Sequence, residues 1–426
     1  MQSRRVVILT YDFVPHAASI GACQRMLYLA HHLQSEGEDV ELVVADGRFM
    51  GWFGLERIAS RISVHRFRSC VNRVRGGRAG AATAEASAGN ALRRFLGGIA
   101  KSLSKRVFPD YSIVDSIGIY RQLRARISTA GNCTLLISGP PHGLFLHVFW
   151  VKWFWPNVRV VLDYRDGWMS QRIFRPKTRF GVAVGRFLER ALLQRADGVT
   201  YASPKFPALL RREIQFDLAH KGQLVMNGWV PEDECPDPIS FDFDLDSVNV
   251  GYFGAASEDD RSYRDIGPLL TSVGASGSKV TLHCFGPIEL KRSRSEYRNC
   301  VFHGNLSQQA AMDCMRRMDW LVVLHTDRET GEEPVPAKLF DYIRTKRPIL
   351  CIWAGDGAAP EIVKDEGLGV VVDPRTPGAL EGALAVIAES GSTDEWIFTC
   401  DDSAYSRRTQ YQRMSTFLRT IGGHVK

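Results

Sequence analysis

The stretch that most constrains the fold runs from residue 321 to 348 and reads LVVLHTDRETGEEPVPAKLFDYIRTKRP. It begins with four apolar residues, a run typical of a buried parallel strand. A polar loop follows, and Pro334 and Pro336 then flank the start of a helix, where proline is well tolerated. Residues 347–353 form the next apolar run. Strand, acidic loop, helix and strand in this order indicate an open α/β sheet, which binds ligands at the carboxyl ends of its strands.

The start of this predicted helix is suited to an anion, because its first backbone N–H groups have no partner within the helix. Val335, Ala337 and Lys338 are the residues expected to offer such donors. Glu333 precedes them in the loop, and Asp341 follows in the second helical turn. A phosphate at the helix start would lie between the two carboxylates, each near hydroxyl groups, as in a nucleotide sugar. The competing interpretation is a solvated acidic loop with Asp341 on an exposed helix face.

The segment PVPAKLFDYIRTKRPIL resembles the donor-binding motif of the family-4-like glycosyltransferases of the GT-B fold. In that motif seven residues separate two glutamates, a spacing that Glu333 and Asp341 reproduce with one shortened carboxylate. The chain carries PVP in place of the glycine-rich run of many members. The resemblance implies that Asp341 holds the ribose and that Glu333 lies near the transferred sugar. It also implies transfer with retention and without a metal.

Two further strands are predicted to end in polar loops, TLLISGPPHG at 134–143 and VRVVLDYRDGW at 158–168. Because parallel strands end at one edge of a sheet, His142 and Asp166 are expected to converge there. The two segments resemble the Ser-x-Pro-Pro-His and Asp-x-Arg-Asp-x-Trp motifs of the same family. We therefore expect His142 and Asp166 to be catalytic or substrate-binding residues. Arg165 is expected to fix the loop instead.

Two glycines and two arginines complete the predicted donor site. The segment 4–46 is expected to form a strand, a loop over 15–23, a helix from Ala22 to Glu36 and a second strand. The resemblance places Gly21 of that loop near the donor diphosphate. Gly254 follows a predicted strand that begins at residue 248. Family members often place a basic residue after this strand. Arg261 and Arg264 are both near it, and the sequence leaves open which one contacts phosphate.

The fold class is therefore predicted to be α/β, with two Rossmann-like domains facing across a cleft, the GT-B arrangement. Residues 1–230 form the expected acceptor-side domain, with a basic insert at about 61–107. An acidic, proline-containing linker spans 231–247, and the nucleotide-sugar domain spans 248–400. The resemblance implies that a last helix, within 401–426, crosses back to the first domain.

Cysteine usage and hydropathy indicate the compartment. The nine cysteines include no Cys-x-x-Cys pair, which favours reduced thiols in a cytoplasm over a zinc site or a disulfide framework. The N-terminus is predicted to be a first strand, not a signal peptide, and no run of 18 apolar residues exists. Alternating aspartates occur only in the linker, at 241–247, so no metal or other cofactor is expected.

A local concentration of positive charge predicts a membrane partner. Residues 61–107 contain eleven lysines and arginines against one acid, Glu85, and 91–107 combine helically spaced apolar residues with five basic ones. Such a segment is typical of an interfacial amphipathic helix on an anionic bilayer. Packing of its apolar face on the first domain is the alternative. We expect a cytoplasmic protein, peripheral on the inner face of the membrane.

The sequence thus predicts an enzyme, a glycosyltransferase that moves a sugar from a nucleotide-diphosphate sugar to an acceptor, which we expect to be lipid-linked or a precursor of a surface polysaccharide or glycolipid. The first alternative is a non-catalytic nucleotide-sugar-binding or scaffold protein of the same fold. Nucleic-acid binding is not expected, because the basic stretch lacks interleaved aromatic residues. A dinucleotide-dependent dehydrogenase is disfavoured, because no Gly-x-Gly-x-x-Gly follows the first strand. The sequence leaves the oligomeric state, the sugar and the nucleotide open.

Overall fold

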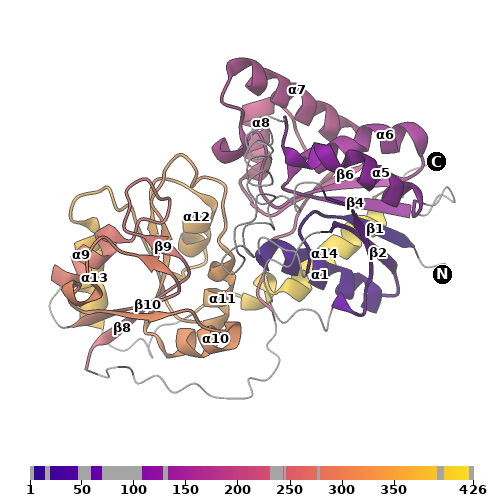
Figure 1. Cartoon of the computed structure of the whole chain (residues 1–426). Coiled ribbons are helices and arrows are strands. Elements are labelled where there is room, and N and C mark those ends of the chain that lie inside the picture. The colour runs from indigo at the N-terminus through magenta and orange to yellow at the C-terminus, as the bar shows by residue number, and fades with distance from the viewer. Residues whose placement is uncertain are drawn as a thin grey trace, which may run out of the picture. The chain divides into compact units, whose positions relative to one another are not determined.

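The computed structural model describes residues 4–14, 20–46, 59–69, 108–127, 133–230, 243, 246–275, 279–390 and 398–421. The chain forms two compact units (Figure 1). Unit 1 comprises residues 1–225 and 411–426, and unit 2 comprises residues 226–410. The chain thus leaves unit 1 after Val225 and returns at Tyr411, whereas the sequence placed these boundaries at 230 and 401. The basic segment 91–107 lies outside the described residues.

Unit 1 contains a seven-stranded parallel sheet in the order β3-β2-β1-β4-β5-β6-β7. Its strands are β1 (Arg5–Leu9), β2 (Asp39–Ala45), β3 (Ser63–Phe67), β4 (Cys133–Gly139), β5 (Arg159–Tyr164), β6 (Gly198–Tyr201) and β7 (Gly222–Leu224). The helices are α1 (Ile20–Ser35), η1 (Tyr111–Asp115), α5 (Ser116–Arg124), η2 (His142–Leu146), α6 (His147–Phe154), η3 (Arg172–Phe174), α7 (Arg179–Arg195) and α8 (Phe206–Ile214).

Alternation along the strands of unit 1 divides its interior into two apolar clusters, one on each face of the sheet. On one face, Val7, Leu9 and Leu135 pack with helices α5, α6, α7 and α8. On the other face, Val6 and Ile8 pack with α1 and with α14 (Arg407–Thr420). Figure 1 shows α5, α6 and α7 together on one side of this sheet and α1 and α14 on the other. Both faces are covered, as a parallel sheet requires.

Unit 2 contains a six-stranded parallel sheet in the order β12-β10-β8-β13-β14-β15. Its strands are β8 (Val248–Phe253), β10 (Val280–Phe285), β12 (Cys300–Gly304), β13 (Trp320–His325), β14 (Ile349–Trp353) and β15 (Gly369–Val372), with a short pair β9 (Ala256–Ser257) and β11 (Ile288–Glu289). The helices are α9 (Gly267–Ala275), η4 (Arg294–Glu296), α10 (Gln308–Arg317), α11 (Ala337–Thr345), α12 (Ala358–Asp365), α13 (Ala379–Ser390) and η6 (Asp402–Tyr405).

The strand order determines where unit 2 can bind a ligand. Successive strands run outward from β8 to β12, and the chain then returns to place β13 on the other side of β8. Ligands of doubly wound sheets bind at the carboxyl ends of the two strands where the order reverses. In unit 2 these strands are β8 and β13, which end at Phe253 and His325. The predicted α/β fold class is confirmed.

Two sequence-predicted elements differ from the structure. Helix α1 begins at Ile20, so Gly21 lies in its first turn and not in a loop; glycine is accepted at a helix start, where the N–H groups lack helical partners. Residues 224–229, LVMNGW, also have the pattern of a strand in the sequence, but β7 spans only Gly222–Leu224. It ends there because the Met226 N–H donates to the Gln410 side chain, 2.8 Å away, and not to a neighbouring strand.

Candidate functional site

The site at the β13 edge of unit 2 begins with a loop braced against the sheet. The His325 ring stacks on Trp353 with ring centroids 4.7 Å apart, and its Nε2 lies 3.1 Å from the Thr330 hydroxyl. Thr330 in turn donates to Asp327 at 2.7 Å. Burial lowers the pKa of His325 to about 4, so its ring is neutral near pH 7. This chain of contacts holds residues 326–336 in place ahead of helix α11.

The two predicted donor acids take different positions on this loop and helix. Glu333 is buried in the loop, four residues before the first residue of α11, and the neighbouring Glu332 carbonyl accepts the Ala358 N–H at 3.0 Å. Asp341 is half-buried in the second turn of α11. Pro336 caps the helix, which starts at Ala337, so Ala337 and Lys338 carry N–H groups of its first turn while Val335 precedes it.

Lys338 joins the start of α11 to the end of β8. Its ammonium donates to the Phe253 carbonyl at 3.1 Å and lies 3.9 Å from the centre of the Tyr252 ring. A Cβ built on Gly254, whose φ is +128°, would stand 3.8 Å from the same nitrogen. Burial, with a smaller contribution from the positive charge of Arg264, holds the pKa of Lys338 well below its usual value. The geometry brings Gly254 and Lys338 together.

The two candidate arginines are separated by the fold. Arg264 is half-buried, with its guanidinium 4.9 Å from the centre of the Tyr263 ring, and its charge acts on Lys338. Its loop is tied to the end of β13, because the Thr326 N–H donates to the Tyr263 carbonyl at 2.9 Å. Arg261 is exposed in a turn where its N–H donates to Asp259 at 3.0 Å. Arg264 is therefore the arginine whose charge lies close to Lys338.

Sequence reasoning missed a row of aromatic rings across this edge. Phe253 stacks on Phe285 with centroids 4.5 Å apart, and Phe285 stacks on His303 at 4.3 Å, both pairs within 9° of parallel. Each ring is followed by a glycine with positive φ, namely Gly254 (+128°), Gly286 (+124°) and Gly304 (+78°). A Cβ on Gly286 would lie 2.6 Å from the Gly254 carbonyl oxygen, so the turns need glycine. The repeated aromatic-Gly pair at three strand ends was the available signal.

At the edge of unit 1, His142 lies in an aromatic cage. It begins η2, is 1% exposed, and its Nε2 lies 3.0 Å from the Asp166 carbonyl oxygen. Its ring is parallel to Trp168 at 5.9 Å and meets the edge of Phe174 at 4.9 Å. Burial lowers the pKa of His142 to about 4, so the imidazole is neutral near pH 7.

The loop after β5 is fixed by Arg165. Its guanidinium donates to the Gly139 carbonyl at 3.4 Å and to the Pro140 carbonyl. The neighbouring Asp166 is half-buried, and burial raises its carboxyl pKa, although the charge of Arg165 acts in the opposite direction. The structure therefore brings His142 and Asp166 together through a backbone contact. The loop-fixing function of Arg165 is visible in its two carbonyl contacts.

A buried ion pair behind this edge was also missed. Arg25 of α1 makes two hydrogen bonds to Asp163 of β5, at 2.7 and 3.2 Å, and both side chains are at most 2% exposed. Asp163 also accepts from Thr200 and Ser138, each at 2.9 Å. Burial acts to raise the pKa of Asp163, but Arg25 and these hydroxyls lower it overall.

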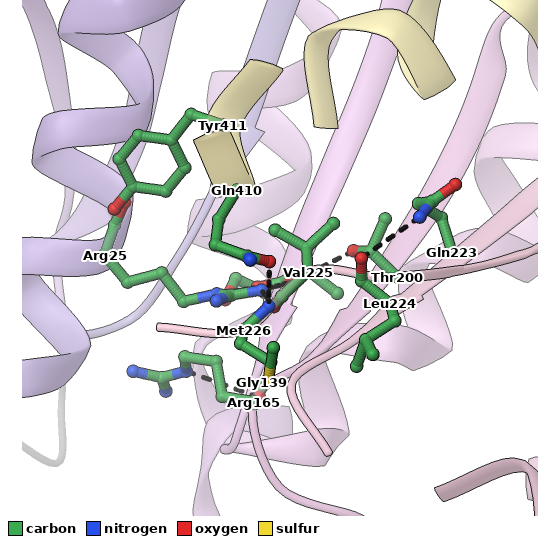
Figure 2. A network of polar contacts seen from close by, with 12 residues as sticks. Arg25, Gly139, Arg165, Thr200, Gln223, Leu224, Val225, Met226, Gln410 and Tyr411 are labelled. Carbon is green, nitrogen blue, oxygen red and sulfur yellow. Dashed lines mark hydrogen bonds and ion pairs between the residues drawn. The ribbon is translucent and has the colours of Figure 1, made fainter. Parts of the chain in front are cut away.

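The same arginine also contacts the two points at which the chain leaves and re-enters unit 1. Its guanidinium donates to the Val225 carbonyl at 2.9 Å, and its own carbonyl accepts from the Tyr411 hydroxyl at 3.0 Å (Figure 2). Val225 is the last residue of unit 1 before the exit, and Tyr411 the first after the return. No local pattern could pair Arg25 with a residue 138 positions away.

Within the residues that the structure describes, no three or more His, Cys, Asp or Glu side chains are grouped so as to hold a metal ion. None of the helices described is long and apolar enough to cross a bilayer.

The comparisons with known proteins identify the fold. No family model matches the chain, and no curated protein matches its sequence. Among solved structures, sucrose-phosphate synthase from Thermosynechococcus elongatus is similar with a TM-score of 0.54 and 16% identity, over 98% of this chain and 94% of that one. TarM of S. aureus, in a complex that contains UDP, has a TM-score of 0.55 and 10% identity over 98% and 100%. The lipopolysaccharide outer core galactosyltransferase WaaB has a TM-score of 0.56 and 9% identity over 97% and 99%.

These structural neighbours are glycosyltransferases of the GT-B fold. They match nearly the whole of this chain, and both of its parallel sheets fit that architecture. The chain has the two-domain α/β GT-B fold.

Proposed function

We propose that this protein is a glycosyltransferase that transfers a sugar from a nucleotide-diphosphate sugar to an acceptor. The observation that carries the proposal is the buried amine of Lys338, which lies beside Gly254 at the start of α11 and on which the positive charge of Arg264 acts. Holding two positive charges together in a partly buried place is unfavourable unless an anion is bound there. A diphosphate at a helix start satisfies both charges and the first helical N–H groups.

The chemistry then follows from the positions of these groups. As the sugar leaves, negative charge develops on the distal phosphate, and Lys338, Arg264 and the N–H groups of Ala337 and Lys338 would stabilise it without a metal. Asp341 would accept hydrogen bonds from the ribose, and Glu333 would lie near the transferred sugar. We propose transfer with retention, in which the acceptor oxygen bonds to the anomeric carbon on the same face from which the nucleotide diphosphate leaves. No other cofactor is needed for this step.

We assign the acceptor to the β4–β5 edge of unit 1. His142 and Asp166 are the proposed catalytic or acceptor-binding residues there. His142→Ala should abolish transfer while free nucleotide diphosphate still binds. Loss of nucleotide binding in this variant would contradict the assignment. The acceptor is proposed to be lipid-linked or a precursor of a surface glycan, with 91–107 on the inner leaflet of the cytoplasmic membrane.

A non-catalytic nucleotide-sugar-binding protein is the second possibility at the same site. The experiment that separates the two has two stages. A thermal-shift screen over nucleotide sugars first identifies the donor, since a ligand at 100 times its Kd adds about 2.7 kcal/mol of stability. Release of nucleotide diphosphate from that donor is then measured with and without added acceptor extract. Binding without any turnover would support the non-catalytic function, and no stabilisation by any nucleotide sugar would contradict both.

A further inference from the structure

One face of unit 1 carries an unusual number of exposed apolar side chains. We call it the α6–α7 face and define it by Trp153, Phe154, Ile173, Phe180 and Phe187, which are 81%, 57%, 65%, 80% and 72% exposed. They belong to α6, η3 and α7, and α6 packs beside α7 (Figure 1). Among the described residues of α1 and α14, on the other face of the sheet, no large apolar side chain is exposed. Among the described residues of unit 1, the large exposed apolar side chains therefore lie on one side of the sheet.

Helix α7 arranges its outward residues in two neighbouring stripes. At 100° per residue, Arg179, Arg186 and Arg190 fall on one line, and Phe180 and Phe187 fall on the next. All five are exposed. The buried side of the helix, by contrast, is built from Gly185, Glu189, Leu192 and Leu193. The outward side is thus amphipathic in its own right, with rings beside guanidinium groups.

The charge of this region is almost entirely positive. Residues 172–195 contain seven arginines and lysines and a single acid, Glu189. Glu189 is fully buried and accepts the Met169 N–H at 3.1 Å, so it does not act at the surface. Glu213 of α8 pairs with Arg175 at 2.9 Å and with Arg186 at 3.1 Å. Lys177, Arg179 and Arg190 are exposed beyond that acid.

We propose that the α6–α7 face docks on an anionic lipid bilayer. Tryptophan favours the headgroup level of a membrane and phenylalanine the boundary with the acyl chains. Each basic residue near an anionic leaflet adds about 1 kcal/mol. A symmetric contact with a second copy would bring two arginine-rich surfaces together, and like charges across an interface oppose association. An anionic bilayer can pair its headgroups with the arginine stripe of α7 and bury the phenylalanine stripe at the same time.

The position of the chain at Phe108 agrees with this orientation. Phe108 is the first described residue after the basic segment 91–107, and its ring lies 5.9 Å from that of Trp168. Its ring atoms also come within 3.5 Å of a Cβ built on Gly185 of α7. The basic segment therefore rejoins the described chain beside α7. The docking surface is independent of sugar transfer, so its test needs no donor.

The test is co-sedimentation of the full-length protein with vesicles of neutral phosphatidylcholine or of the same lipid with about one third phosphatidylglycerol. Phe180→Ser/Phe187→Ser and Arg179→Gln/Arg190→Gln are expected to weaken binding to anionic vesicles, the arginine pair by roughly 25-fold at low salt. Arg408→Gln/Arg413→Gln removes the same charge from exposed positions of α14 and should bind as the parent does. The thermal stability of each variant is measured to show that it folds.

A second measurement locates the contact. Quenching of tryptophan fluorescence by brominated lipids should fall in Trp153→Phe, because Trp153 is the most exposed ring of the face. Equal binding to neutral and anionic vesicles would overturn the proposal. So would unchanged binding by both α7 variants, with loss only when the basic residues of 91–107 are replaced by glutamine. A concentration-dependent dimer that disappears in the phenylalanine variant would assign the face to a second copy instead.

Discussion

The polar residues at the carboxyl edges of the two sheets are held in different ways. In unit 1, His142 lies against the Asp166 carbonyl, Arg165 donates to the Gly139 and Pro140 carbonyls, and Arg25 pairs with Asp163. In unit 2, burial and, to a smaller extent, the positive charge of Arg264 lower the pKa of Lys338. In the first arrangement the buried charges have partners, whereas in the second the charged form of Lys338 is disfavoured and a bound anion would favour it. Whether a polar residue at a strand end serves the fold or a ligand can therefore be inferred only when its partners are known.

The comparison predicts that substitutions in unit 1 act mainly on folding. Asp163→Ala should have the largest effect, about 3–5 kcal/mol, because it leaves the Arg25 guanidinium buried without its carboxylate. For a unit of this size that corresponds to a fall in Tm of roughly 6–20 °C, measured by calorimetry. Asp39→Ala is the matched control, since its pair with Arg5 at 2.9 Å is 40–45% exposed and should contribute at most about 1 kcal/mol. Equal losses of stability in the two variants would show that the buried ion pair contributes no more than the exposed one.

Substitutions in unit 2 should act on donor binding and turnover with little loss of stability. Lys338→Ala and Arg264→Ala should each lower turnover by about 100- to 1,000-fold, because each removes a charge that stabilises the leaving diphosphate. Arg261→Ala removes the same charge from the same loop and should change turnover less than about threefold. Steady-state rates and nucleotide affinity by calorimetry decide this. A larger effect at Arg261 than at Arg264 would contradict the site as drawn.

The two donor acids should separate binding from chemistry. Asp341→Ala should weaken nucleotide diphosphate binding by about 1–3 kcal/mol, since it leaves ribose hydroxyls without an acceptor. Glu333→Ala should lower turnover more than it changes that affinity. Isothermal titration with the nucleotide, followed by turnover at saturating donor, measures both. Parent-like transfer by both variants would show that these residues do not form the donor site.

The smallest predicted effect is a pH dependence centred on Lys338. Its pKa is depressed in the folded protein below the 10.5 of a free lysine. Between these two values the unfolded chain binds more protons, so the contribution of Lys338 to stability rises with pH across that window. Anion binding favours the charged amine, so affinity should fall as pH rises through the folded pKa. Titration in buffers of different ionisation enthalpy should show proton uptake in the parent and its loss in Lys338→Met.

The local sequence was sufficient for most of the elements and for the grouping of some residues of the proposed donor site. Apolar runs predicted the strands, and the prolines at 334 and 336 predicted a helix that the structure begins at Ala337. Glu333, Lys338 and Asp341 lie within one strand–loop–helix unit, so their separation along the chain determines their positions on it. The aromatic-Gly pairs at 253, 285 and 303 were also present in the sequence as a repeated pattern. Only their stacking required neighbouring strands.

Tertiary structure decided what depends on residues distant in the chain. Arg264 lies close to Lys338 and Arg261 does not, because the loop after β8 is tied to Thr326 at the end of β13. Arg25 meets Asp163 only when α1 covers the sheet, and that pairing is what makes both charges tolerable inside it. Periodicity reports which side of an element is apolar, since it depends on nearest neighbours along the chain. The partner of a charge depends on sheet order and crossover connections, which no local pattern contains.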